Sequence, residues 1–326
     1  MILGIDTSNY TTSVCLIDSE GSIRKEGRML LSVKEGGRGL QQSAALFQHI
    51  KNLPKLLEEI GPINHLSGVA VSVKPRPLEG SYMPVFLAGE SVARAIAASR
   101  DVPLFRTTHQ EGHISAGEGS AGNVEANEFL AVHISGGTTD LLRVKRLVSG
   151  YIIEELGSSS DLHAGQFVDR VGVALGLPFP SGPHLEKLAM LAHQGKESAS
   201  VSLPVSVRGY DLSFSGPASA ALRLIEQGVD RASIARAVEK CIAKALEKVL
   251  LRAMSETRLN HILIVGGVAA NGFIRARLRQ RMEHPAVKAK LYFAEPQYST
   301  DNAFGVARLG LLSLRVCSNS IKDLVD

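Results

Sequence analysis

Two histidines four residues apart are the first feature of this 326-residue sequence with the chemistry of a metal site. His109 and His113 are the first and last residues of the segment HQEGH. On a helix, residues four apart share one face, so two imidazoles can meet one metal ion; the alternative is two unrelated polar residues. A zinc peptidase needs a glutamate directly after the first histidine, where this chain has Gln110. Glu111 lies about 100° further round the helix, which disfavours peptidase chemistry.

A third metal ligand must come from elsewhere, because two histidines leave an ion under-coordinated. Asp301 is the best candidate, since it lies in the segment STDNA (299–303) at the start of the last predicted helix. The alternative is that Asp301 caps this helix. Cys15, Cys241 and Cys317 are far apart and form no CxxC pair, so neither a disulfide framework nor a cysteine zinc site is expected. We expect all three cysteines to be buried.

Three glycine-containing loops follow predicted strands and also carry hydroxyl or amide side chains. They are GIDTS (4–8), ISGGTTD (134–140) and VGGVAAN (265–271). A glycine pair after a strand is often only a turn. Glycine also lets backbone N–H groups approach an anion, and nearby hydroxyls add donors. Together the loops indicate a nucleotide site, although neither a P-loop motif nor GxGxxG after a strand occurs.

The elements that would position these groups form two similar series. Three predicted strands (2–5, 11–16, 23–29) precede a helix (40–60), a strand (69–73), a helix (85–98) and a strand (102–105). Three further strands (129–134, 141–146, 151–156) precede helices over 167–175, 185–193, 218–226 and 232–254. A strand (262–265), a helix (273–281), a strand (290–293) and a helix (303–314) follow. The series predict a duplicated α/β unit with a ligand cleft between lobes.

The segment 106–128 lies between the two series and is rich in Gly, Ser, Thr and His. We expect it to form a loop, or a short helix flanked by turns, that acts as a hinge. Hydrophobic residues make up 44% of the chain and charged residues 21%, which is ordinary for a globular protein and excludes disorder and collagen-like repeats. No apolar run approaches the ~18–20 residues of a membrane span, and no signal peptide is visible. We therefore expect a cytoplasmic protein without a membrane partner.

Basic residues recur along two predicted helices, and the formal net charge is +4. They are Arg236, Lys240, Lys244, Lys248 and Arg252, then Arg275, Arg277, Arg279 and Arg281. One interpretation is a solvated helix face, partly neutralised by Glu239 and Glu247. The other is a surface that contacts nucleic-acid phosphates, for which binding would weaken steeply with salt.

The loops and motifs resemble those of known proteins. The facing glycine loops are similar to those of actin-like and sugar-kinase-like ATPases (the ASKHA fold), where two loops hold phosphates and a third supports adenosine. Along nearly its whole length the chain also resembles the TsaD family, the threonylcarbamoyl transferases that modify tRNA. The motifs that carry this resemblance, in order, are HQEGH (109–113), SGGTT (135–139), GQFVD (165–169), LGLPFPSGP (175–183), DLSFSG (211–216), GGVAAN (266–271) and TDNA (300–303).

The resemblance implies a two-lobed α/β protein of the ASKHA fold, with duplicated RNase-H-like lobes and a nucleotide cleft between them. The N-terminal lobe is expected over residues 1–115, joined by the C-terminal helix 303–326. The C-terminal lobe is expected over 116–302, with a helical insertion at about 160–230.

The resemblance also implies an N6-L-threonylcarbamoyladenine synthase-type acyltransferase. Such an enzyme passes a threonylcarbamoyl group from threonylcarbamoyl-AMP to the exocyclic amine of the adenosine beside the anticodon of tRNA. One divalent metal, iron or zinc with magnesium as the alternative, is expected on His109, His113 and Asp301. The residues expected to contact the adenylate, or another adenine nucleotide, are His133, Ile134, Ser135, Gly136, Gly137, Asp169, Gly182, Glu186 and Asn271. Expected partners are tRNA, a related inactive subunit (TsaB-like) and a P-loop ATPase (TsaE-like), with a homodimer as the alternative.

The first loop departs from the family pattern. It usually reads ETSCDET, whereas this chain has DTSNYTT (6–12), so both acids at its end are missing. We expect Asp6 and Thr11 to be the catalytic residues of this loop. The usual GPG after the fourth strand is replaced by SVKPRP (72–77). These departures leave an alternative function, a divergent paralogue that binds an adenylate and a metal but uses another acceptor or is regulatory.

Overall fold

The computed structural model describes residues 1–8, 10–32, 40–192 and 201–322. The chain divides into two compact units. Unit 1 comprises Met1–Asn123, Arg146–Ile152 and Gln297–Asp326, and unit 2 comprises Val124–Lys145 and Ile153–Pro296. Three parts of the sequence predictions, namely Asn9, His193 and positions 323–326 of the C-terminal helix, lie outside the described residues. The lobe boundaries near residues 115 and 302 stay a prediction.

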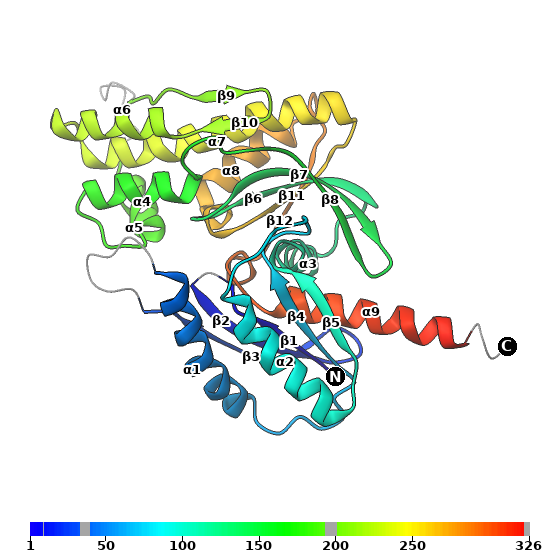
Figure 1. The fold of residues 1–326 in the computed structure, drawn as a ribbon. Helices are drawn as coiled ribbons and strands as arrows, with labels where there is room; N and C mark the ends of the chain where they lie inside the picture. The colour runs from blue at the N-terminus through cyan, green and yellow to red at the C-terminus, as the bar shows by residue number, and fades with distance from the viewer. Residues whose placement is uncertain (9, 33–39, 193–200, 323–326) are drawn as a thin grey trace. The chain divides into compact units, whose positions relative to one another are not determined.

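Unit 1 is built on a five-stranded sheet of order β3-β2-β1-β4-β5 (Figure 1). The strands are β1 (Ile2–Asp6), β2 (Thr11–Ile17), β3 (Ile23–Leu30), β4 (Gly68–Lys74) and β5 (Leu104–Thr108). The first three strands pair antiparallel, whereas β1, β4 and β5 run parallel. Along β1, Ile2 faces one side of the sheet and Leu3 and Ile5 face the other, and all three are buried. Helices must therefore cover both faces.

Two helices cover each face of this sheet. α1 (Gln42–Ile60) and α2 (Phe86–Arg100) pack on the side of Leu3 and Ile5. α3 (His109–Ala121) and α9 (Phe304–Lys322) pack on the side of Ile2. The last two helices approach closely, because a Cβ placed on Gly305 would lie 2.7 Å from the backbone nitrogen of Ala116. Glycine at position 305 therefore lets the first turn of α9 lie directly against α3.

Unit 2 contains a second five-stranded sheet, of order β12-β11-β6-β7-β8. Its strands are β6 (Glu128–Ile134), β7 (Thr139–Leu147), β8 (Gly150–Ser158), β11 (His261–Val265) and β12 (Lys290–Phe293). Its helices are α4 (Ala164–Ala174), α5 (Gly182–Met190), α6 (Ser215–Glu226), α7 (Arg231–Thr257) and α8 (Gly272–Met282). The minor elements are β9 (Ser206–Arg208), β10 (Asp211–Ser213), η1 (Gly267–Ala270) and η2 (Pro296–Tyr298). The 27-residue α7 carries much of the apolar core that packs against β6 and β11.

The two sheets share one topology, in which an antiparallel three-stranded set is followed by two parallel strands. This confirms the predicted duplication of an α/β unit. All the strands and helices predicted from periodicity are present, with ends shifted by up to three residues except in α9, which continues eight residues beyond the predicted end at 314. The short β9–β10 pair was not predicted. The segment 106–128 holds the end of β5 and the 13-residue α3, which is the helical one of the two alternatives expected there. Residues 112–118 of α3 are all buried, the polar ones included. This helix therefore has no solvent-facing polar side, and its sequence shows no amphipathic period.

The cysteine predictions are confirmed in part. Cys15 and Cys241 are buried, whereas Cys317 is exposed, which contradicts the expectation for it. Cys317 lies near the end of α9, where Arg315 and Ser318 are exposed as well. Among the described helices, none has both the length and the apolar character needed to cross a membrane.

Candidate metal centre and nucleotide site

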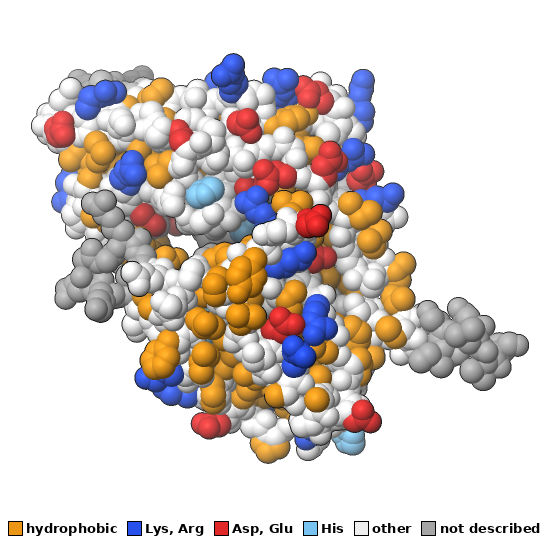
Figure 2. Space-filling model, viewed as in Figure 1, with side chains coloured by type: hydrophobic (Ala, Val, Ile, Leu, Met, Phe, Trp, Pro, Cys, Tyr) orange, Lys and Arg blue, Asp and Glu red, His pale blue; other side chains and the backbone are white. Residues whose placement is uncertain are grey.

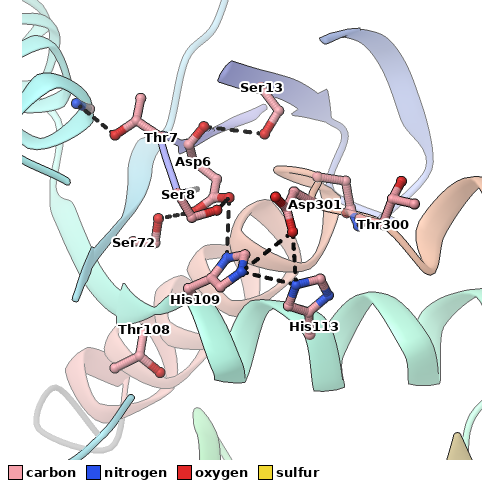
Figure 3. A network of polar contacts seen from close by, with 12 residues as sticks. Asp6, Thr7, Ser8, Ser13, Ser72, Thr108, His109, His113, Thr300 and Asp301 are labelled. Atoms are coloured by element: carbon pink, nitrogen blue, oxygen red, sulfur yellow. Dashed lines mark hydrogen bonds and ion pairs between the residues drawn. The ribbon is translucent and has the colours of Figure 1, made fainter. Parts of the chain in front are cut away.

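His109, His113 and Asp301 form a compact cluster in unit 1 (Figure 3). Nε2 of His109 lies 3.0 Å from Nε2 of His113. Oδ1 of Asp301 lies 3.5 Å and 3.3 Å from the same two nitrogens. Two atoms bound to one ion at about 2.1 Å, with angles of about 90–109° between them, lie roughly 3.0–3.4 Å apart. The three side chains therefore fit a single metal ion.

A capping box at the start of α3 fixes the helix that carries both histidines. Thr108 Oγ1 accepts a hydrogen bond from the backbone N–H of Glu111 at 3.2 Å, and Glu111 Oε2 accepts from the backbone N–H of Thr108 at 3.0 Å. One turn of helix then aligns His109 and His113. Glu111 Oε2 also accepts from the hydroxyl of Thr107 at 3.0 Å. The carboxylate is thus engaged in the cap, which argues further against a peptidase base.

Asp301 reaches the cluster from the turn between η2 and α9. Asn302 holds this turn, because its Nδ2 donates to the carbonyls of Thr300 and Tyr298 at 2.7 Å and 3.2 Å. Its Oδ1 accepts from the backbone N–H of Phe304 at 3.1 Å. Asn302, rather than Asp301, therefore makes the bond that caps α9. The side chain of Asp301 is 21% exposed, against 4% for that of His113, so it lies at the more open side of the cluster.

Asp6, at the end of β1, is completely buried beside His109, with Oδ2 3.3 Å from the ring atom Nδ1. Burial would raise the pKa of Asp6, but His109 and two serine hydroxyls outweigh it and lower this pKa. Burial would lower the pKa of His109, but the carboxylates of Asp6 and Asp301 raise it. Burial and the neighbouring His109 hold the pKa of His113 below its usual value. The lowered pKa favours the neutral form of His113, which is the form that binds a metal.

Thr11, the other residue expected to act in catalysis, begins β2 and is buried. Its backbone N–H donates to the carbonyl of Ser8 at 3.3 Å. Across the described ranges, no hydrogen bond connects Thr11 to the cluster of His109, His113 and Asp301. The catalytic roles of Asp6 and Thr11 stay predictions.

The residues predicted to contact the adenylate all lie in unit 2. His133 and Ile134 end β6, and residues 135–137 form the loop before β7. Asp169 lies on α4, Gly182 and Glu186 lie on α5, and Asn271 precedes α8.

Close backbone contacts bring the ends of β6 and β11 together with the start of α4. A Cβ on Gly165 would lie 2.6 Å from the carbonyl oxygen of Ser135, and the Gly165 N–H donates to that oxygen at 3.0 Å. Gly266 has φ +100°, and a Cβ on it would lie 2.9 Å from the nitrogen of Ile134. These two glycines therefore explain why the second and third glycine loops meet in unit 2.

The three polar side chains predicted to contact the adenylate each accept a hydrogen bond from a backbone N–H; they are Asp169, Glu186 and Asn271. Asp169 Oδ1 accepts from the Ser181 N–H at 2.7 Å, and burial raises the pKa of Asp169. Glu186 Oε1 accepts from the Gly272 N–H at 2.7 Å. These bonds fix one oxygen of each carboxylate. Asn271 Oδ1 caps α8 by accepting from the backbone N–H of Ile274 at 2.9 Å.

Glu239, which one interpretation of the sequence placed on a solvated helix face, is a buried polar residue of this region. Its Oε1 accepts from Asn271 Nδ2 at 2.7 Å, and its Oε2 accepts from Arg236 at 2.6 Å. Burial raises the pKa of Glu239 to about 7, although Asn271 and Arg236 act against this. The available signal for the contact with Arg236 was an oppositely charged pair three residues apart, with only apolar residues at 237 and 238 between them.

Acidic side chains pair with most arginines of the predicted basic stripe. The pairs are Arg236–Glu239 at 2.6 Å, Arg252–Glu256 at 2.8 Å, Arg277–Glu247 at 3.5 Å, Arg281–Glu247 at 2.8 Å and Arg279–Glu283 at 2.9 Å. Within the described part of the chain, no ion pair involves Lys240, Lys244 or Lys248. The lysines are thus the charges of this stripe that are best placed to meet a polyanion.

Residues 37–308 match the family described as TsaD: tRNA N6-adenosine threonylcarbamoyltransferase. The chain belongs to the TsaD family. It is also 30% identical over 324 residues to a "probable bifunctional tRNA threonylcarbamoyladenosine biosynthesis protein" of Methanothermobacter thermautotrophicus. That alignment covers 96% of the chain and 55% of the relative, so this TsaD family member spans about half of the relative's length.

Solved structures share the fold of this TsaD family member. The activator of the 2-hydroxyisocaproyl-CoA dehydratase from Clostridium difficile with bound ADPNP has a TM-score of 0.56 at 14% identity, covering 99% of this chain and 97% of that one. HypF from T. kodakarensis has a TM-score of 0.58 at 15% identity, covering 96% and 48%. A ROK family glucokinase from Streptomyces griseus in complex with glucose and AMPPNP has a TM-score of 0.53 at 12% identity, covering 95% and 98%. These likenesses confirm the expected ASKHA fold and, at these identities, concern the fold alone.

Proposed function

We propose that this chain transfers a threonylcarbamoyl group from threonylcarbamoyl-AMP to N6 of the adenosine beside the anticodon of tRNA. The observation that carries the proposal is the TsaD family match over residues 37–308, a range that includes all the predicted metal and adenylate residues. The archaeal relative is named for the biosynthesis of the same tRNA modification. The donor and the acceptor position come from the resemblance to the family.

Unit 2 would bind the adenylate. Backbone N–H groups of the loop 135–137 would stabilise negative charge on the phosphate as AMP leaves. Asp169 and Glu186 suit ribose hydroxyls, because a backbone N–H already holds one oxygen of each carboxylate in place. Asn271 keeps one amide N–H for the base or the ribose, since Glu239 accepts the other.

His109, His113 and Asp301 would hold one divalent ion, iron or zinc, in unit 1. Bound there, the ion would supply Lewis-acid polarisation of the acyl–phosphate anhydride. In the transfer, N6 attacks the carbonyl carbon, a C–N bond forms, and the C–O bond to phosphate breaks. AMP leaves with the electron pair, and N6 loses one proton. Because an aromatic amine is a weak nucleophile, positioning of the two substrates must supply much of the rate.

The test combines the purified protein with threonylcarbamoyl-AMP, unmodified tRNA, and a TsaB-like and TsaE-like partner set that is active with another TsaD family member. Mass spectrometry of the digested tRNA should detect the modified adenosine. His113→Ala should abolish the product, whereas a matched change at the exposed His284, His284→Ala, should not. No product from the wild-type protein under these conditions would contradict the proposal.

A second candidate, a paralogue with another acceptor or a regulatory role, is favoured by the segment beside the metal cluster. Lys74 pairs in register with Thr108, directly before His109. The carbonyl of Pro75 accepts from the backbone N–H of Gln110 at 3.0 Å. Lys74 and Arg76 thus lie on a segment that is hydrogen-bonded to the start of α3, the helix that carries His109 and His113. The first loop lacks the acids that are usual in the family. Adenylate binding by calorimetry without tRNA modification would support this candidate, and no nucleotide binding would exclude it.

Exposed apolar side chains on unit 1 support a protein partner. Phe47 and Ile50 on α1 are 61% and 53% exposed, and Tyr82, four residues before α2, and Leu87, on α2, are 63% and 44% exposed. Figure 2 shows hydrophobic side chains gathered over α1 and α2 on the face in view. Such groups mark interaction surfaces. We propose the related inactive subunit as the occupant. Light scattering of the chain alone and mixed with that subunit distinguishes this partner from a homodimer.

A further inference from the structure

Asp6 lies behind the metal cluster, at the far edge of the His109 ring. Its Oδ2 is 3.3 Å from Nδ1 of His109, while Nε2 of the same ring faces His113 and Asp301 (Figure 3). The two ring nitrogens stand on different edges of an imidazole, so Asp6 meets the nitrogen that does not face the metal position. Among the described residues, the group able to ligate one ion contains His109, His113 and Asp301 without Asp6.

The carboxylate of Asp6 is itself held in place. Ser8 Oγ donates to Oδ2 at 2.5 Å, and Ser72 Oγ donates to Oδ1. The hydroxyl of Ser13 donates to the backbone carbonyl of Asp6 at 3.3 Å. With its side chain completely buried and both oxygens engaged, Asp6 cannot swing toward the metal position or toward a substrate.

We propose that Asp6 is a positioning residue of the metal centre. Its carboxylate accepts the proton on Nδ1 of His109, which fixes the ring orientation and leaves the lone pair of Nε2 directed at the ion. Carboxylates that orient metal-bound histidines in this way raise ligand basicity and metal affinity. The inference rests on the metal site of the proposed function but not on the transfer reaction. It assigns Asp6 a different role from direct contact with the substrate.

The competing explanation is a structural role alone, because the bond between Asp6 and Ser72 also joins β1 to β4. The two explanations differ in what they predict for the metal. A structural role affects the stability of the sheet and leaves the ligand field of a bound ion unchanged once the protein is folded. A positioning role changes the affinity and the ligand field together.

The experiment measures Co²⁺ affinity by chelator competition, and the visible spectrum of bound Co²⁺, in the full-length protein. Asp6→Asn keeps the shape of the side chain, but its amide can donate to Nδ1 and so place the ring proton on Nε2. We expect its Co²⁺ affinity to fall about 10–100-fold, with a changed spectrum. Ser72→Ala is the matched control, because it removes a bond to Asp6 and leaves the carboxylate on His109; its affinity should stay close to that of the wild type. Wild-type affinity and spectrum in Asp6→Asn would overturn the proposal.

A second measurement needs no variant and therefore covers a failure of Asp6→Asn to fold. Long-range ¹H–¹⁵N correlation spectra of the Zn²⁺-loaded wild-type protein report which ring nitrogen of each histidine carries the proton. The proposal requires a proton on Nδ1 and the metal on Nε2 of His109, and the reverse tautomer overturns it. Failure of the wild-type protein to bind either metal would refute the metal site itself, whereas tRNA transfer could fail with this proposal intact.

Discussion

Replacing Gly305 by alanine should destroy metal binding although it changes none of the ligands. Gly305 lies on α9, four residues after Asp301, and packs against the part of α3 that carries the histidines. A Cβ at this position would lie 2.7 Å from the backbone nitrogen of Ala116 and 2.8 Å from the carbonyl carbon of Gly112, and closer still to the Gly112 oxygen. All three atoms are backbone, so no side-chain rotation can relieve the clash.

The size of the effect follows from these distances. Carbon atoms in ordinary contact are about 3.5–4.0 Å apart, so α3 and α9 must separate by about 1 Å or more at this point. Metal–ligand distances tolerate only about ±0.2 Å. Asp301 would then move out of reach of an ion held by the two histidines. Overpacking of this kind costs about 1–3 kcal/mol, which a folded domain can absorb, so the metal should be lost before the fold.

The assay is Co²⁺ competition together with thermal unfolding of the metal-free protein. Gly305→Ala should bind Co²⁺ more than about 100-fold more weakly, beyond the 10–100-fold effect of losing a supporting contact. Gly112→Ala is the matched control at the same interface, because its Cβ would lie 3.2 Å from the side-chain atom Cγ2 of Val306 and 3.9 Å, an ordinary contact, from the backbone nitrogen of Val306. It should retain most of the affinity. Unchanged Co²⁺ binding by a folded Gly305→Ala protein, or an equal loss in the control, would refute the argument that this close helix contact places Asp301.

Three further predictions concern Asn302, Glu239 and the lysines of α7. Asn302→Ala removes three hydrogen bonds from the turn that carries Asp301, and we expect it to weaken Co²⁺ binding about 10–100-fold, with Asn302→Asp intermediate. Burial holds the pKa of Glu239 at about 7 against 4.5 for the free group. The folded protein then keeps a proton that the unfolded chain has lost, so stability should fall by about 3 kcal/mol as the pH rises from below 4.5 to above 7. In Glu239→Gln, the free energy of unfolding measured in urea should no longer fall over this pH range. If tRNA meets the lysines of α7, Lys240→Ala and Lys244→Ala should each reduce the salt dependence of tRNA affinity by about one phosphate contact, whereas Arg281→Ala, already paired with Glu247, should change it less.

Periodicity predicted most of the fold because most elements have an obvious buried face or are buried on both sides. Strand β11 reads as an apolar run, and α1 has an apolar stripe. Helix α3 has neither signal, since its composition of Gly, Ala, Ser and His resembles that of a loop. The burial that makes α3 a helix comes from α9, almost 200 positions away in the sequence, and no local window contains that information.

Residue type and spacing predicted which three side chains form the cluster, but not the residues that support them. The spacing of His109 and His113 is a local property of a helix, and Asp301 followed from its place before the last helix. The contact of Asp6 with His109 depends on how β1 packs against α3, so the sequence alone left Asp6 as a residue expected to be catalytic, without its contact to a histidine. The pairing of Glu247 with two arginines of α8 is likewise a contact between helices. The sequence indicated that Glu239 and Glu247 partly neutralise the basic stripe, but not that Glu247 does so from one helix to the next.

The small residues of α3, which leave its sequence without a clear helical period, also allow His109, His113 and Asp301 to come together. Helices with ordinary side chains pack with their axes about 8–10 Å apart, because bulky residues fill the interface. Along α3, Gly112 and Ala116 face Gly305 instead, and their backbones nearly touch. Asp301 is too short a side chain to span a wider gap, so the histidines and the carboxylate share one ion position only if this interface stays free of large side chains. An HxxxH pair within a run of small residues between two well-patterned strands therefore indicates a buried helix that packs by close backbone contact.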